Sequence, residues 1–455
     1  MQMIDAAQKT LDLQYFIYRN DETGRLITGA LLRAASRGVR IRLLVDDGPM
    51  LPGDEKILLL RAVPNMEVRI FNPFVQREPN RVLRSIEFAV DSQRLDYRMH
   101  NKLLVADNAV ALIGGRNIAD AYFQIDPDWQ YADDDIFIGG PMVERLSQTF
   151  DEFWNSTLAI PAQALQRTMP SDASVQEYRK CLADEWMRVH SNDLPFMRRA
   201  ESGDPLSGIV DGRLPVVWAS GQIVSDSPDK KAVNDGGMIG RLIYGPVAKA
   251  ADSAQSEALV ITPYFVPTAS ELELLERMRQ RGASVRVLTN SLESSDEVLA
   301  HSGYVKYREQ LLREGVELHE LKTLPGNARG SGQSAAMNRY GNYGLHAKFY
   351  VFDRKKLVIG SMNFDQRSVK LNTEVGMIVD SAELALETEK RFERMTEPAN
   401  AYTVQFSDDT SGSPHLTWRT VEAGEPVVLT REPARNWWQR VTTELCRLLP
   451  LDREL

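Results

Sequence analysis

Cysteine is scarce in this chain of 455 residues, which contains only Cys181 and Cys446. Two thiols so far apart in sequence make neither a disulfide framework nor the paired spacing of a zinc site. We therefore expect no structural disulfide and no metal held by cysteine.

Long hydrophobic runs are also missing. No stretch approaches the roughly 18–20 apolar residues that a membrane-spanning helix requires, and no signal peptide is visible. The first residues, MQMIDAAQKTLDLQYFIY, begin in the middle of a helix-to-strand pattern. We therefore expect further residues upstream in the native protein, where an anchor or targeting segment would lie.

The chain also lacks an excess of positive charge. Its 54 Lys and Arg residues are outnumbered by 63 Asp and Glu residues, which gives a formal net charge of -9. General nucleic-acid binding requires a basic face that neutralises phosphates, so this balance argues against a nuclease or nucleic-acid partner. Hydrophobic and charged fractions of 43% and 26% are those of a soluble globular protein, and the length allows two or three domains.

One spaced set of residues is present twice. Residues 99–117 read MHNKLLVADNAVALIGGRN, and residues 345–363 read LHAKFYVFDRKKLVIGSMN. In each copy a His is followed by Lys at two residues, Asp five further on, Gly seven after that and Asn three later. Five matching positions are improbable at average residue usage, so they indicate an internal duplication.

The surrounding sequence supports the duplication. AASRGVRIRLLVDD (34–47) has a counterpart in RMRQRGASVRVLTNS (277–291), and helical patterns in both halves alternate with apolar segments at 11–18, 39–45, 258–266 and 284–288. This alternation predicts α/β units around a largely parallel sheet. We predict lobes at 1–159 and 214–400, a helical linker at 160–213, and a C-terminal extension at 401–455 that ends in an amphipathic helix.

The repeated His and Lys indicate the chemistry of the site. Residues two apart share one face of a strand, and an unpaired buried Lys is costly, so we place both at a strand end that opens on a pocket. Imidazole, ammonium and amide groups together suit an anionic phosphate, whereas a divalent metal would require carboxylates. We therefore predict neither a metal nor a cofactor.

Two facing lobes would present two histidines to one phosphodiester. One would attack phosphorus and form a phosphohistidine, and the other would protonate the leaving alcohol and deprotonate the incoming one. Residues predicted to bind or surround the phosphate oxygens are Lys102, Lys348, Asn117, Asn363, Gly115 and Ser361.

A nucleophilic imidazole also needs an acceptor at its second nitrogen. We predict that Glu374, in NTEVGMIV, orients His346 and that Asp135, in DDDIFIGG, orients His100. As members of the repeat, Asp107 and Asp353 are counted with the catalytic set, although their odd spacing from Lys predicts hydrogen bonds that hold a turn. Of the other histidines, His301 is considered as a pocket residue.

This paired set resembles the signature of the phospholipase D superfamily, His-x-Lys-x4-Asp followed by Gly-Gly/Ser-x-Asn in two copies. Nearly the whole chain is similar to bacterial cardiolipin synthases of the type without N-terminal membrane helices, as in LDLQYFIYRNDETG, RGVRIRLLVDDG, FNPF, IGGRNIADAYF and GVELHELK. The resemblance implies two α/β/α lobes with the active site at their interface. It further implies metal-independent phosphatidyl transfer, with His100 as nucleophile and His346 as acid and base.

The resemblance implies cardiolipin synthesis from phosphatidylglycerol and a second phospholipid, with phosphatidylethanolamine among the candidates. The alternative is a phospholipase D that hydrolyses phospholipids to phosphatidic acid. A nuclease or other phosphodiesterase and a non-catalytic lipid-binding protein are less favoured, the latter because both His and Lys pairs are intact.

The C-terminal stretch NWWQRVTTELCRLLPL predicts an amphipathic helix. Its apolar residues are Trp437, Trp438, Val441, Leu445, Leu448 and Leu449, and Arg435, Arg440 and Arg447 accompany them. Such a helix suits an anionic membrane interface, although docking on the protein's own core is the alternative. We expect peripheral attachment to the bacterial cell membrane, with the cytoplasmic face favoured, and leave the oligomeric state open.

Overall fold

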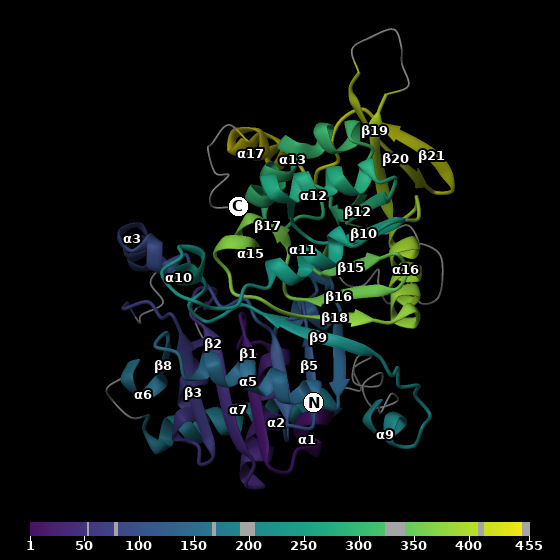
Figure 1. Cartoon of the computed structure of the whole chain (residues 1–455). Coiled ribbons are helices and arrows are strands. Elements are labelled where there is room, and N and C mark those ends of the chain that lie inside the picture. The colour runs from purple at the N-terminus through teal and green to yellow at the C-terminus, as the bar shows by residue number, and fades with distance from the viewer. Residues whose placement is uncertain are drawn as a thin grey trace.

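Two β-sheets organise the chain in a computed structural model (Figure 1). The structure describes residues 1–51, 54–76, 81–165, 170–191, 205–323, 342–407 and 414–447. The first sheet has seven strands in the order β7-β5-β4-β1-β2-β3-β8. Their bounds are β1 Thr10–Tyr15, β2 Arg40–Asp46, β3 Met66–Phe71, β4 Leu103–Ala106, β5 Val110–Gly114, β7 Asp135–Gly139 and β8 Ala159–Pro161.

The second sheet has ten strands in the order β21-β20-β19-β13-β12-β10-β15-β16-β18-β9. Their bounds are β9 Ser220–Ser225, β10 Glu257–Ile261, β12 Ser284–Asn290, β13 Glu317–Leu321, β15 Phe349–Phe352, β16 Lys356–Gly360, β18 Val375–Asp380, β19 Ala401–Phe406, β20 Leu416–Glu422 and β21 Glu425–Leu429. Short ladders pair β11 (Phe265–Val266) with β17 (Phe364–Asp365) and β14 (Asn342–Leu345) with β6 (Trp129–Ala132).

The two sheets repeat one topology. In each, three strands run parallel, β1-β2-β3 and β10-β12-β13. An antiparallel strand, β4 or β15, lies beside the first of them and is followed by two more, β5-β7 or β16-β18. The predicted duplicated α/β fold is therefore confirmed, because corresponding segments take corresponding places in both sheets.

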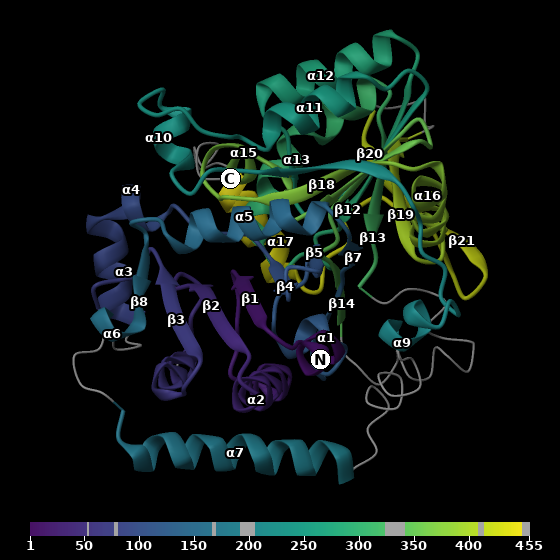
Figure 2. The same ribbon diagram turned by 60° about the horizontal axis from the view of Figure 1, so that its bottom comes forward.

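Helices cover the sheets on both sides. The first lobe contains α1 Gln2–Ala6, α2 Glu22–Ser36, η1 Asp54–Ala62, α3 Arg81–Val90, α4 Ser92–Leu95, η2 Asp120–Tyr122, α5 Met142–Trp154, α6 Ala162–Leu165 and α7 Asp172–Ser191. The remainder contains α9 Pro205–Val210, α10 Lys230–Asn234, α11 Tyr244–Asp252, α12 Ala269–Gln280, α13 Val298–Arg313, α15 Gln366–Lys370, α16 Ala382–Thr396 and α17 Trp437–Arg447. Figure 2 shows α7 across the far side of α2, away from the second lobe.

The lobes share one hydrophobic core. Buried side chains from the inner faces of both sheets, among them Leu103 and Ile113 from the first and Leu259 and Ile359 from the second, form a single cluster with α5 and α16. Separate clusters lie under α2 and η1 on one side and under α11, α12 and α13 on the other. Burial of this common inner layer holds the two lobes in one relative position.

Two predicted boundaries are revised by the sheet pairings. The expected extension at 401–455 is not separate, because β19 pairs with β13 and carries β20 and β21 into the second sheet. In the expected linker at 160–213, β8 completes the first sheet and α7 packs on α2 and η1. Residues 166–169 and 192–204 of that linker lie outside the described residues.

The first strand of each lobe is shorter than predicted. The apolar segments 11–18 and 258–266 leave their sheets after Tyr15 and Ile261, and in the second lobe Pro263 offers no backbone N–H for a ladder. Beyond these points Tyr18 bridges Ile118, and Phe265 pairs with Phe364. The segments thereby cross over the repeated Gly-x-x-Asn turns instead of continuing in the sheets.

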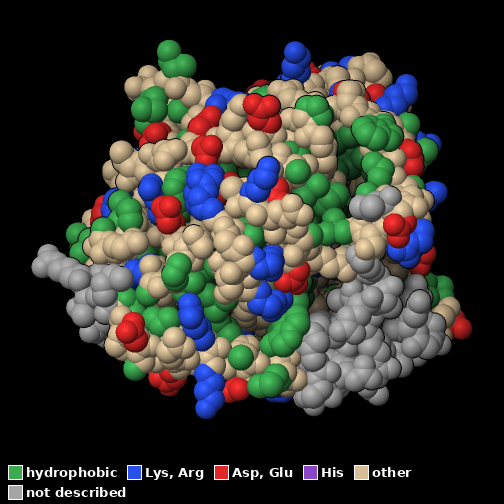
Figure 3. All heavy atoms as spheres, turned by 90° about the horizontal axis from the view of Figure 1, so that it is seen from below, with side chains coloured by type: hydrophobic (Ala, Val, Ile, Leu, Met, Phe, Trp, Pro, Cys, Tyr) green, Lys and Arg blue, Asp and Glu red, His purple; other side chains and the backbone are tan. Residues whose placement is uncertain are grey.

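The face of the molecule seen from below is mixed in character (Figure 3). Hydrophobic, basic and acidic side chains are interspersed there, and no His is visible among the described atoms of this view. Within the described ranges, no helix is long and apolar enough to cross a membrane.

Candidate active site

Both repeated histidines lie at the edge of their sheet that faces the other lobe. His100 and Lys102 immediately precede β4, and His346 and Lys348 immediately precede β15. Because β4 and β15 run antiparallel to β1 and β10, they begin where those strands end. All four side chains are buried, at the strand ends where they were predicted to lie.

Each histidine is held through its backbone by the opposite lobe. His100 N–H donates to Thr373 O at 2.9 Å, and His346 N–H donates to Ala132 O at 2.8 Å. The residues that follow these carbonyls are Glu374 and Asp133. The two backbone contacts therefore deliver a carboxylate from one lobe to the histidine of the other.

The predicted pairing of histidines and carboxylates is wrong. His100 Nδ1 lies 2.9 Å from Glu374 Oε2, and His346 Nδ1 lies 2.6 Å from Asp133 Oδ2. Both bonds cross between lobes, whereas the prediction paired Glu374 with His346 and Asp135 with His100. Spacing within a half could not show this exchange, because it arises only when the lobes pack together.

The sheet register explains why Asp135 is not the partner. Gly114 lies opposite Asp135 in β7, whereas Gly360 lies opposite Gly376 in β18. The equivalent acidic positions are therefore two residues earlier, at 133 and 374. Asp135 instead accepts from Arg116 Nε at 2.9 Å.

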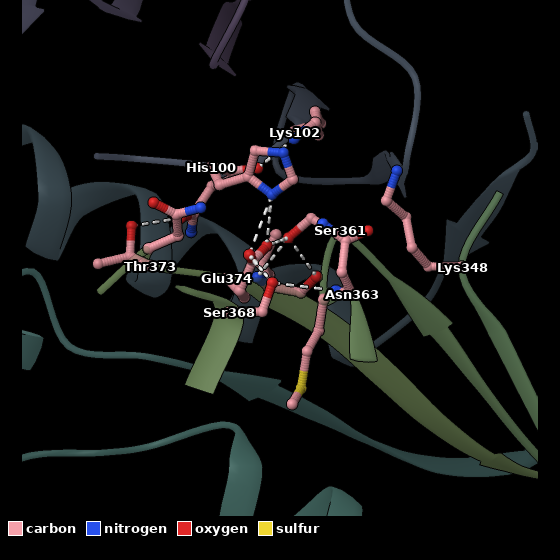
Figure 4. A network of polar contacts seen from close by, with 12 residues as sticks. His100, Lys102, Lys348, Ser361, Asn363, Ser368, Thr373 and Glu374 are labelled. Atoms are coloured by element: carbon pink, nitrogen blue, oxygen red, sulfur yellow. Dashed lines mark hydrogen bonds and ion pairs between the residues drawn. The ribbon is translucent and has the colours of Figure 1, made fainter. Parts of the chain in front are cut away.

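Glu374 is braced from several directions (Figure 4). Its carboxylate accepts from Ser361 Oγ at 2.5 Å and from Ser368 Oγ at 2.9 Å, in addition to facing His100. Its backbone N–H donates to Asp226 Oδ2 at 2.9 Å. Burial raises the pKa of Glu374 to about 7 in spite of these donors and the nearby Lys102.

The Gly-Gly/Ser position differs between the two halves for a steric reason. A Cβ atom at Gly115 would lie 2.3 Å from Asp133 Oδ1, so no side chain fits there. At the matching position of the second half, Ser361 donates to Glu374. Both residues were predicted to surround the phosphate, and the structure instead places them against the two carboxylates that orient the histidines.

The two lysines are buried close to the histidines. Lys102 Nζ donates to His100 O at 2.5 Å, and Lys348 Nζ lies 2.8 Å from His346 Nδ1. Burial lowers the pKa of Lys102 well below its ordinary value and that of Lys348 to about 8. Figure 4 shows both lysines on the same side of Ser361 and Glu374 as the His100 ring.

Both imidazoles are neutral at neutral pH. Burial is the largest cause that lowers the pKa of each histidine well below its ordinary value, and the charges of Lys102 and Lys348 lower both further. Protonation of His100 would lower the pKa of His346 further. In the tautomer in which Nδ1–H is donated to the carboxylate, each Nε2 keeps a free lone pair.

The two motif asparagines have different surroundings. Asn117 is fully used within the protein, since Oδ1 accepts from Ile17 N at 3.1 Å and Nδ2 donates to Tyr122 OH at 2.9 Å. Asn363 is 3% exposed, and its Oδ1 is buried with no hydrogen-bond partner among the described residues. Of these two asparagines, Asn363 is therefore the one with a buried side-chain atom that has no partner among the described residues.

Asp107 and Asp353 lie away from the histidines, which corrects their place in the catalytic set. Asp107 follows β4 and accepts from the backbone N–H groups of residues 8, 9 and 10. Asp353 follows β15 and accepts from those of residues 255, 256 and 257. These bonds lower the pKa of each carboxyl in spite of partial burial, and they hold the start of β1 or β10 to the turn, as their spacing predicted.

Several residues near the histidines were missed. The rings of Phe16 and Tyr122 lie 5.0 Å from those of His100 and His346, and the Tyr131 ring lies 5.2 Å from that of His346. Lys230 Nζ and Asp226 Oδ2 form a buried ion pair at 2.8 Å, and the same Asp226 oxygen accepts from the backbone N–H of Glu374. None of these residues belongs to the repeated motif. The one sequence feature that could have pointed to them is that Tyr131 lies two residues before Asp133, and therefore on the same face of an extended segment.

His301 is not a pocket residue. Its Nε2 lies 2.8 Å from Glu432 Oε1 in a buried cluster with Arg308. Within the described ranges, no group of three or more His, Cys, Asp or Glu side chains is placed to hold a metal ion.

The C-terminal helix is docked by its polar side. In α17, Gln439 and Thr443 are buried, and Gln439 Nε2 donates to Leu292 O at 2.5 Å. Trp437 and Trp438 are 57% and 62% exposed. Leu448 and Leu449, predicted to continue the apolar face, lie outside the described residues.

Known proteins resemble this chain over most of its length. The family "Cardiolipin synthase, PLD-like domain" matches residues 1–154 and 247–396. Cardiolipin synthase C of Escherichia coli (strain K12) is 37% identical over 462 residues, which cover 99% of this chain and 92% of that protein. The probable cardiolipin synthase YwiE of Bacillus subtilis (strain 168) is 23% identical over 85% of this chain and 61% of that protein.

One solved structure shares the overall fold. The phosphatidylserine synthase of Haemophilus influenzae Rd KW20 aligns with a TM-score of 0.54 and covers 88% of this chain and 83% of its own. At 13% sequence identity, this likeness concerns the fold alone.

Proposed function

Because this chain belongs to the phospholipase D-like cardiolipin synthase family, we propose that it transfers a phosphatidyl group between phospholipids. The favoured reaction is cardiolipin synthesis from phosphatidylglycerol and a second phospholipid, which could be phosphatidylethanolamine. The observation that carries the proposal is the crossed pair of bonds, His100 to Glu374 and His346 to Asp133. In this proposal the two imidazoles, each held at Nδ1 by a carboxylate of the other lobe, act from opposite sides on one phosphodiester.

In the first step, His100 Nε2 forms a bond to phosphorus as the bond from phosphorus to the head-group oxygen breaks. The leaving oxygen takes a proton from His346 Nε2. The bound phosphodiester carries a negative charge, which raises the pKa of a neighbouring imidazole and lets His346 enter this step protonated. In the second step, the acceptor hydroxyl gives its proton back to His346, and its oxygen replaces His100 on phosphorus.

The asymmetry of the two carboxylates favours His100 as nucleophile. A phosphorylated imidazole is positive, and Glu374 with its two serine donors is suited to remain a carboxylate beside it. Burial raises the pKa of both carboxyls, so the distinction rests on their donors: two serine hydroxyls at Glu374 and the backbone N–H of Asp134 at Asp133. We therefore assign His100 as nucleophile and His346 as acid and base.

The buried lysines take the role of a metal in this proposal. Lys102 and Lys348 would neutralise the non-bridging oxygens, so no cofactor or metal is invoked. A cavity of about 380 Å³ is lined in part by Tyr122 and Tyr131, whose rings also lie 5.0 and 5.2 Å from that of His346, and we assign it to a lipid group of the substrate. Exclusion of water there would favour transfer to a lipid hydroxyl over hydrolysis.

Purified protein with phosphatidylglycerol in detergent micelles, with and without phosphatidylethanolamine, tests the proposal. Cardiolipin as product supports a synthase, whereas phosphatidic acid would support the alternative phospholipase. Acid-labile phosphohistidine should accumulate in His346→Asn and be absent from His100→Asn. Accumulation in the opposite variant would reverse the roles, and loss of activity with a chelator would refute the metal-free mechanism.

A further inference from the structure

Two helices of this protein are amphipathic in the inverted sense, with polar side chains turned inward and apolar side chains outward. In α17, Gln439 and Thr443 are buried while Trp438 and Leu445 are 62% and 61% exposed. A surface helix that packs on its own protein normally buries its apolar stripe. The exposed stripe of α17 therefore has no counterpart within the described part of the chain.

Helix α3 of the first lobe is built in the same way. Arg84 reaches back to Asp47 Oδ1 at 3.1 Å, and Glu87 accepts from Val75 N at 2.7 Å. Ile86 and Val90, four residues apart and thus on one helix face, are 56% and 84% exposed. Figure 1 shows α3 at the left edge of the first lobe and α17 at the upper left of the second lobe, and Figure 2 shows α17 nearer the middle of the molecule than α3.

Both helices are connected to the site through short chains of contacts. Arg435, just before α17, lies over the Trp129 ring and donates to Ser295 O, and Trp129 adjoins Tyr131, which touches His346. On the other lobe, Asp47, which α3 contacts, follows Asp46, the acceptor of Met99 N–H next to His100. Each helix is thus linked by contacts to one of the two histidines.

We propose that α3 and α17 together form the surface that seats this protein on an anionic lipid bilayer, with the interlobe site between them. The inference rests on the proposed function, since a phosphatidyl group must reach the site from a membrane. Paired tryptophans suit the membrane interface. In and just before α17, Arg435, Arg440 and Arg447 outnumber Glu444. This local positive charge complements anionic lipid, although the whole chain carries a net charge of -9.

Vesicle flotation tests the surface independently of turnover. Parent protein should float with phosphatidylglycerol-containing vesicles and much less with phosphatidylcholine vesicles, because anionic lipid attracts the arginines. The double variants W437Q/W438Q and I86Q/V90Q should each bind about tenfold or more weakly, since both remove apolar contact area. Trp218→Gln is the matched control, because Trp218 is 93% exposed elsewhere and should bind like the parent.

The outcomes separate this inference from the proposed function. Parent-like flotation of either double variant, with an unchanged melting temperature, would overturn the two-helix surface even if micellar transfer activity is present. Binding that follows the prediction without any transfer activity would refute the function and leave the surface standing. If W437Q/W438Q instead converts a dimer into a monomer in lipid-free solution, the face is an interface between copies and the inference fails.

Discussion

At the scale of the residue, two sequence repeats become two unlike histidines. His100 faces a carboxylate fixed by two serine hydroxyls, whereas His346 faces one that lies against a glycine. The difference arises because Asp133 Oδ1 lies where a Cβ of residue 115 would be, at 2.3 Å from it, so a serine hydroxyl is not provided there. Two repeats of one motif thereby acquire two distinct imidazole environments.

Glu374→Gln should lower turnover by roughly 10³-fold or more, because an amide no longer fixes the tautomer of His100 or supports a positive imidazole. Asp135→Asn is the matched control and should stay within about tenfold of the parent, since Asp135 contacts Arg116 rather than a histidine. The measurement is the steady-state rate of phosphatidyl transfer. Equal losses in both variants would contradict the crossed pairing.

The alkaline limb of the pH profile should report on Lys348. Burial lowers its pKa to about 8, so its positive charge is present below that pH and is lost as pH rises through it. We expect kcat/KM to fall above about pH 8, because this ratio reports groups of the free enzyme. In Lys348→Arg the guanidinium stays charged, so the fall should move to higher pH even if the maximum rate drops. An unmoved alkaline limb in that variant would assign it to another group.

At the scale of the element, the repeated aspartates act as clamps between the first strand of each lobe and the turn after β4 or β15. Both stand in the left-handed region, with φ of 54° at Asp107 and 53° at Asp353. Asn and Asp tolerate this conformation better than other side-chain-bearing residues. The motif therefore combines residues of the pocket with residues that secure the strand carrying them.

Asp107→Asn should lower the free energy of unfolding by about 1–2 kcal/mol, since it weakens charge-assisted bonds to three backbone N–H groups while preserving the preference for positive φ. Because those bonds lower the pKa of Asp107, their contribution is present above the unfolded pKa of about 4 and is lost as pH falls through the folded value. Urea unfolding at pH 7 and pH 3 measures it. A constant difference at both pH values would show that the charge is not responsible.

At the scale of the whole molecule, the site exists only between lobes. Each histidine takes its backbone acceptor and its carboxylate from the other lobe, and the inner faces of both sheets share one core. The lobes are therefore interdependent in folding as well as in chemistry.

Residues 1–191 and 205–455 produced separately should show no transfer activity, because each piece lacks the carboxylate partner of its own histidine and exposes its half of the common core. Co-expression should restore activity in a copurifying complex. The measurement is turnover per mole of complex, with each piece alone as control. Full activity in either piece alone would show that the lobes do not depend on each other.

The sequence by itself determined the duplicated α/β topology and the positions of the two His and Lys pairs, and it predicted hydrogen bonds from Asp107 and Asp353 that hold a turn. These follow from periodicity and from spacing along one chain. Only the tertiary structure decided that Glu374 contacts His100, that Asp133 contacts His346, and that α17 turns its tryptophans outward. Those features depend on the register between strands and on the packing of one lobe against the other, which bring together residues whose separation in sequence carries no information about distance.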